Sequence, residues 1–210
     1  MTTARDVVMR RIRDALGSAP SAPDDVPREY RRAGEPVDFD PVERFCEVVA
    51  DYDATVHRVD ESGLEGALAE TCRARGAARL VVAPGAPWTP DGADLVADDP
   101  PLGPRDLDAL DGVLTGCAAA IAQTGTIVLD SGALSGRRAI TLVPDLHLCV
   151  VRAEQIVPAV PDAIAAVADA VREGRPITFV SGPSATADIE LIRVQGVHGP
   201  RVLDVFVVEG

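Results

Sequence analysis

The sequence contains no lysine and no asparagine, so all 20 of its basic residues are arginines. Without a lysine amine the chain cannot form a Schiff base with a carbonyl substrate, and it cannot supply the lysine of a nucleotide-binding P-loop. Aromatic residues make up only 3% of the chain. The hydrophobic core must therefore be built mainly from valine, leucine, isoleucine and alanine.

Closely spaced cysteines are also missing. Iron–sulfur and structural zinc sites normally show close cysteine spacings, and this chain has no C-x-x-C pair. The three histidines have no clustered partners; we expect His57 at the surface and His147 as a structural residue in a strand. We therefore expect no metal site and no cofactor bound by this chain. Its cysteines are interpreted as small apolar residues in a reducing compartment: Cys46, Cys72, Cys117 and Cys149.

No apolar run approaches the roughly 20 residues that a membrane span needs. The first 16 residues mix arginine with aspartate and have no continuous apolar stretch, unlike a signal peptide. The net charge of −13 argues against nucleic acid or an anionic membrane as the main partner, although it permits a locally positive pocket. We expect a cytoplasmic protein.

The chain of 210 residues is long enough for one α/β domain with a short appendage. Val8, Ile12 and Leu16 follow a helical i, i+4 spacing. Prolines then recur between residues 18 and 41, where neither a helix nor a central strand tolerates them. We divide the chain into an N-terminal helix and Pro-rich arm, 1–40, and an α/β domain, 41–210. The N-terminal helix either binds a partner protein or packs on the α/β domain of its own chain.

Strand and helix patterns alternate after residue 41, which predicts a mostly parallel sheet covered on both faces. Two adjacent strands, 139–143 and 147–151, predict a hairpin and hence a mixed sheet. A capping box at Ser62 and Glu65 predicts the start of a helix that Gly76 ends. Further helices are predicted at 3–16, 45–52, 118–123 and 160–171, and further strands at 55–59, 79–83, 126–129, 177–180 and 202–208. The segment 112–117 is predicted to be a short strand or a turn.

The C-terminal segment contains the most informative pattern. Two apolar runs predict buried strands at 177–180 and 202–208, and two polar, glycine-rich segments, 181–190 and 196–200, lie between them. Hydroxyl and carboxylate side chains thus follow the carboxyl end of a strand, where open α/β sheets usually bind ligands. The alternative is a strand-to-helix turn with ordinary capping residues.

The residues that could carry chemistry lie in these turns. We expect Ser184–Glu190 to open a helix whose unpaired N–H groups could hold a carboxylate or phosphate. Asp188 and Glu190 either transfer protons or only stabilise that first turn, and His198 either moves protons or bonds the backbone. Gly125 is either a helix cap or a point where the backbone approaches an oxyanion. The candidate catalytic residues are Asp188, Glu190 and His198, and the candidate ligand-binding residues are Gly125, Thr126, Gly182, Ser184, Thr186 and Gly199.

These segments also carry a family resemblance. The sequence GPSATADIE at 182–190, followed by GVHGP at 196–200, resembles the closing signature of LUD-domain proteins. IAQTGTIVL at 121–129 and LVPDLH at 142–147 extend the resemblance, which is strongest to the lactate-utilisation protein C (LutC/YkgG) family. The resemblance covers roughly the second half of the chain. Ala185 departs from it, since relatives often have arginine there.

The resemblance implies a three-layer α/β/α sandwich like those of the NagB/RpiA sugar-phosphate isomerases and the CoA transferases. It further implies a non-redox component of a system that oxidises L-lactate to pyruvate. The partners would be iron–sulfur proteins that hold the clusters, and the ligand a small anionic metabolite. Two alternatives stay open: a self-sufficient enzyme handling acyl or phosphate groups, for which no CoA-transferase glutamate nucleophile can be placed, and a scaffold or regulatory protein.

The cysteine spacing generates the first prediction. The purified chain is expected to be colourless and to contain no stoichiometric iron, because its cysteines lack cluster spacing. Iron analysis after a chelator wash measures this directly. Iron close to one cluster per chain that survives the wash would contradict our interpretation of the cysteines.

Overall fold

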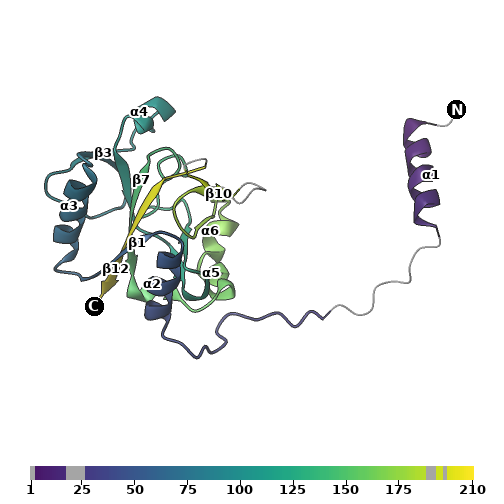
Figure 1. Cartoon of the computed structure of the whole chain (residues 1–210), viewed down its shortest axis with the longest axis horizontal. Helices are drawn as coiled ribbons and strands as arrows, with labels where there is room; N and C mark the ends of the chain where they lie inside the picture. Colours follow the sequence, from purple (N-terminus) through teal and green to yellow (C-terminus); the bar gives the residue numbers. More distant parts are fainter. Residues whose placement is uncertain (1–2, 18–26, 188–192, 196–197) are drawn as a thin grey trace. The chain divides into compact units, whose positions relative to one another are not determined.

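The computed structural model describes residues 3–17, 27–187, 193–195 and 198–210 (Figure 1). The chain divides into two compact units, residues 1–31 and 32–210. Helix α1 (Ala4–Leu16) belongs to the first unit and confirms the predicted N-terminal helix. It starts with a capping box, in which Thr3 and Asp6 bond each other's backbone N–H groups, and it ends at Gly17. None of its residues is buried.

The second unit is built on a six-stranded sheet in which every neighbouring pair is parallel. The last strand along the chain, β12, lies between β1 and β7, and Val205 is in register with Val56 on one side and Cys149 on the other. In sheet order the strands are β1 (Thr55–Asp60), β12 (Val202–Glu209), β7 (Leu146–Arg152), β4 (Gly112–Thr115), β2 (Arg79–Val82) and β3 (Asp94–Ala97).

Helices cover both faces of this sheet, which confirms the three-layer prediction. Helix α3 (Leu64–Arg75) packs Leu68 against Phe206 and its neighbours on one face. Helix α2 (Pro41–Asp51) packs Phe45 on the other face, and α4 (Pro104–Asp108) lies against β2 and β4. In Figure 1 the sheet runs between α3 on the left and α2 on the right. None of the described helices is long and apolar enough to cross a membrane.

A second, smaller sheet packs beside α2 on the same face. Its strands β5, β6 and β9 are antiparallel neighbours, and β8 pairs with β5 in parallel. Two short helices cover its outer side. The elements are β8 (Ile156–Val157), β5 (Ala119–Ile121), β6 (Thr126–Leu129), β9 (Thr178–Val180), α5 (Val160–Ala166) and α6 (Ala168–Arg172), with 3₁₀ turns η1 (Ala122–Thr124) and η2 (Ala153–Gln155). A separate antiparallel pair joins β10 (Ala185–Ala187) to β11 (Arg193–Gln195).

Two predicted elements in the middle of the chain are wrong. The helix expected over 118–123 is strand β5 followed by a 3₁₀ turn, because Ala119 and Ile121 pack under α5 and α6 while Ala120 faces the main sheet. That alternation is the period of a strand. The strand expected at 139–143 is a series of turns whose backbone groups bond locally, so no hairpin with 147–151 exists. The antiparallel pairs lie in the smaller sheets instead.

Three further predictions need correction: two in the C-terminal segment and one at the start of α3. The helix expected from Ser184 is strand β10 over 185–187, where the backbone pairs with β11; residues 188–190 lie outside the described residues. Strand β9 is an edge strand rather than a buried one, and Phe179 on it is 46% exposed. Ser62 forms no capping box: its hydroxyl donates to Asp60, and α3 begins at Leu64.

Gly125 lies in a close contact between α2 and the 3₁₀ turn η1. It ends η1 with a positive φ of 58°, and a Cβ built there would lie 2.6 Å from the backbone nitrogen of Val49. A side chain at this position would collide with backbone, which cannot rotate away. Gly76, which ends α3, has a similar φ of 69° but no atom within 4 Å of such a Cβ.

These two glycines allow the packing cost to be separated from the backbone cost. Gly76→Ala is expected to lower the free energy of unfolding by about 1 kcal/mol, the usual cost of alanine at positive φ. Gly125→Ala should lower it by about 2–4 kcal/mol, because overpacking adds to the same backbone penalty. Urea unfolding of both variants gives the comparison, and equal losses would show that α2 can move away from η1 at little cost.

Candidate functional site

A cavity of about 450 Å³ lies in the second unit, where the segments around the C-terminal turns converge. Its walls come from the turn after α2 (52–53), the loop residues Arg138 and Thr141, and the segments 178–185 and 198–200. His147 and Leu203, each the second residue of its strand, close its base.

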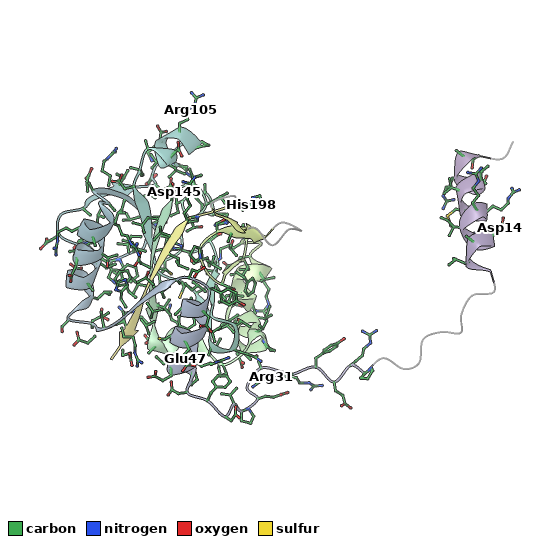
Figure 2. All side chains as sticks on the ribbon, viewed as in Figure 1. Asp14, Arg31, Glu47, Arg105, Asp145 and His198 are labelled. Carbon is green, nitrogen blue, oxygen red and sulfur yellow. The ribbon has the colours of Figure 1, made fainter. Side chains whose placement is uncertain are left out.

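The cavity lies at the amino ends of the parallel strands β1, β7 and β12. Figure 2 shows Asp145, which precedes β7, and His198 toward the same end of the domain, whereas β12 in Figure 1 runs to the C-terminus at the other end. The rule that open α/β sheets bind ligands at carboxyl ends therefore does not account for this site. The strand that led us to apply it, β9, belongs to the smaller antiparallel sheet.

Four of the predicted residues line the cavity: Gly182, Ser184, His198 and Gly199. The Ser184 hydroxyl accepts a hydrogen bond from the backbone N–H of His198 at 3.0 Å, and the Ser184 N–H donates to the carbonyl of Pro200 at 2.7 Å. These two amides therefore hold the two turns together and are not free for a ligand. A Cβ on Gly182 would lie 2.6 Å from the carbonyl oxygen of Tyr52, so glycine lets the opposite walls touch.

The other predicted residues lie elsewhere. Thr126 contacts a residue of the cavity wall, since its hydroxyl forms a hydrogen bond of 2.8 Å with the hydroxyl of Ser181. Gly125 packs against α2. Asp188 and Glu190 lie outside the described residues, and only the backbone of Thr186 is described, in β10. The roles assigned to these residues stay predictions.

Arg138 is the main functional candidate that the sequence reasoning missed. Its Nη1 donates to the carbonyl oxygen and hydroxyl of Thr141, at 2.9 and 3.0 Å. Among the described residues no carboxylate contacts it, whereas the adjacent Arg137 forms an ion pair with Asp98. Burial lowers the pKa of the half-buried Arg138 guanidinium, but arginine keeps its charge in proteins. The available signal was two adjacent arginines after Gly136, directly before the segment predicted as a strand.

His147 brings a neutral ring to the same cavity. The residue is 2% exposed, and its Nε2 lies 2.8 Å from the hydroxyl of Thr115 on β4. Burial, and to a lesser extent the charge of Arg138, lower the pKa of His147 from 6.5 to about 4. His147 lies in a strand as predicted, and it also contributes a hydrogen-bonding group to the cavity wall.

A second polar cluster surrounds the buried carboxylate of Asp204 on β12. Burial alone would raise the pKa of Asp204, but hydrogen bonds from His57 and Arg75 outweigh it and leave the pKa lowered. His57 also stacks on Phe206 with ring centroids 4.6 Å apart. His57 lies on the edge strand β1 with 28% of its side chain exposed, so its surface position is as predicted, and its imidazole also contacts the buried carboxylate. This cluster joins the C-terminal end of α3 to the sheet.

The arrangement of the first cavity suits an anion. It combines one guanidinium that no described carboxylate contacts, a neutral imidazole, serine hydroxyls and apolar walls. Within the described ranges, no group of three or more histidine, cysteine or acidic side chains is arranged to hold a metal ion.

Comparison with known proteins identifies the family. A model of the LUD domain matches residues 104–208. A crystal structure of a DUF162 family protein from Deinococcus radiodurans is 44% identical, covers 80% of this chain and 96% of its own, and superposes with a TM-score of 0.68. The chain therefore belongs to the LUD-domain family.

Within that family the chain is similar to proteins called lactate utilization protein C. The one from Deinococcus radiodurans is 49% identical over 93% of this chain and 91% of its own length. The one from Geobacillus kaustophilus is 33% identical over 54% of this chain and half of its own length. The uncharacterized protein YkgG from Escherichia coli is 29% identical over 75% of this chain. The family resemblance in the sequence motifs is thus confirmed.

The buried His147 generates a pH prediction. Since its folded pKa is about 4 and its ordinary value 6.5, the unfolded chain takes up a proton at a higher pH than the folded chain. Stability is therefore fully present above pH 6.5 and is lost as the pH falls toward 4, by up to about 3 kcal/mol. Urea unfolding across this range is the measurement. His147→Gln should flatten the profile, and an unchanged slope in that variant would assign the acid sensitivity to other groups.

Proposed function

We propose that this chain is a non-redox component of an L-lactate utilisation system, and that it binds a small anionic metabolite in the cavity around Arg138. It acts together with iron–sulfur proteins, which carry the electrons that leave lactate on its oxidation to pyruvate. The names of its relatives support the system. The cavity supports the ligand class.

The observation that carries the proposal is that Arg138 is half-buried and contacts no described carboxylate. This chain has 33 acidic residues against 20 arginines, yet no described carboxylate contacts this half-buried cation. A charge removed from water costs free energy unless a partner compensates it, and a bound anion would supply the compensation. Arg138 would also replace the cation that relatives often carry at position 185, where this chain has alanine.

The division of labour with iron–sulfur partners rests on the cysteines. Cys72, Cys117 and Cys149 are buried, and all four cysteines are unpaired thiols. Burial raises the pKa of the Cys149 thiol to about 12 and that of Cys117 well above its ordinary value. Metal ligands are thiolates, which such surroundings disfavour. We therefore propose that this chain binds no cofactor of its own. Turnover of lactate by the isolated chain would instead favour a self-sufficient enzyme.

A complementation experiment tests the proposal. In a strain deleted for this gene, Arg138→Gln is expected to accumulate as soluble protein and to abolish growth on L-lactate, because the anion loses its counter-charge. Arg201→Gln is the matched control: it removes the same charge from an exposed site that only faces Asp145 at 3.5 Å, and growth should be normal. Growth of the Arg138→Gln strain at the wild-type rate would contradict the proposal.

A further inference from the structure

The chemistry of the cavity wall narrows the ligand further, provided that the cavity is the anion site proposed above. We infer that it selects singly charged carboxylates that carry a hydroxyl or oxo group on the carbon next to the carboxylate. Arg138 holds the carboxylate, His147 meets the neighbouring oxygen, and the apolar wall accepts a longer carbon chain than the single methyl group of lactate.

The free edge of Arg138 has the geometry that a carboxylate needs. Nη1 is committed to Thr141, while Nε and Nη2 have no protein partner in the described residues. Neither of these two nitrogens is a buried atom cut off from solvent. Nη2 lies about 4.0 Å from the position of a Cβ on Gly199, so this edge faces the wall that Gly199 and Ser184 form. The Nε–Nη2 edge can donate two parallel hydrogen bonds to one carboxylate.

The charge of the cavity favours a single negative charge on the ligand. Arg138 is the only arginine among the described residues that line it. The second charge of a dianion such as hydrogen phosphate would therefore meet no additional guanidinium among the described residues.

His147 supplies the contact that distinguishes an oxygenated acid from a plain one. Thr115 fixes the ring through Nε2, which leaves Nδ1 without a partner in the part of the chain that the structure describes. Nδ1 is nevertheless not cut off from solvent. Because His147 lines the cavity, a ligand there can contact this nitrogen. A neutral imidazole can donate to a carbonyl oxygen or exchange a hydrogen bond with a hydroxyl. Nδ1 can therefore pair with a hydroxyl group in either tautomer, and with an oxo oxygen in the tautomer that carries the proton on Nδ1.

The rest of the wall is apolar and larger than lactate requires. Tyr52, Phe179, Val180 and Leu203 line it, and a cavity of about 450 Å³ is within the range of roughly 300–1,000 Å³ that holds drug-sized ligands. Lactate has only six non-hydrogen atoms. Burying each further methylene group against such a wall should improve affinity roughly fourfold.

Titration calorimetry on the full-length chain tests the ligand class. The probes are L-lactate, propionate, which lacks the 2-oxygen, 2-hydroxy-4-methylpentanoate, which has a longer chain, and inorganic phosphate. We expect L-lactate to bind roughly 3–10-fold more tightly than propionate, the worth of one hydrogen bond. The longer hydroxy acid should bind more tightly than L-lactate, and phosphate more weakly.

Variants assign each contact. His147→Gln should remove most of the preference for L-lactate over propionate. Thr115→Val, which releases the ring and also removes the contact of the Thr115 hydroxyl with Cys149, should reduce this preference if His147→Gln does not fold. Arg138→Gln should abolish binding of both acids, and Arg201→Gln should leave the whole series unchanged. Equal binding of propionate and L-lactate to the wild-type chain, or stronger binding of phosphate, would overturn this inference but keep an anion site. Failure of every probe to bind would overturn the anion site as well.

Discussion

The parallel insertion of β12 between β1 and β7 is the constraint on which the rest of this molecule depends. This strand places apolar side chains in the cores on both faces of the sheet, Val205 and Val207 on one side and Phe206 and Val208 on the other. Its register with β7 sets Leu203 beside His147. The turn that precedes β12 therefore arrives next to a histidine that belongs to a strand more than 50 residues earlier, and the cavity forms where they meet.

Asp204 in β12 and Arg138 in the loop before β7 are both at least partly shielded from water, but their charges have different partners. Asp204 is shielded from water but receives hydrogen bonds from both His57 and Arg75, so its charge is compensated within the protein. Arg138 donates hydrogen bonds to the neutral oxygens of Thr141, and no described carboxylate contacts it. Compensated charges of the first kind stabilise folds, whereas perturbed groups without internal compensation concentrate at functional sites.

The sequence predicted the layers and most strands because their apolar runs are β-branched and bounded by glycine or proline. It failed at 118–123, where small alanines fit either a helix or a strand and burial on both sides decided the outcome. It also failed after Ser184, because a capping serine is equally suited to a tight turn between strands. Gly182, Ser184, His198 and Gly199 were found from their turn chemistry. Arg138 was not, because only tertiary structure distinguishes it from the ion-paired Arg137.

The contact between Gly182 and Tyr52 joins parts of the chain that sequence comparison treats separately. The matched LUD domain model spans residues 104–208, yet Tyr52 and Asp53 in the cavity wall, and strands β1, β2 and β3, precede it. A fragment cut at the boundaries of that model would lose half of the main sheet and one wall of the cavity. In the binding site that we propose, substitutions at 52–53 would alter ligand choice while leaving every recognisable motif intact, so relatives with the same signature need not share a ligand.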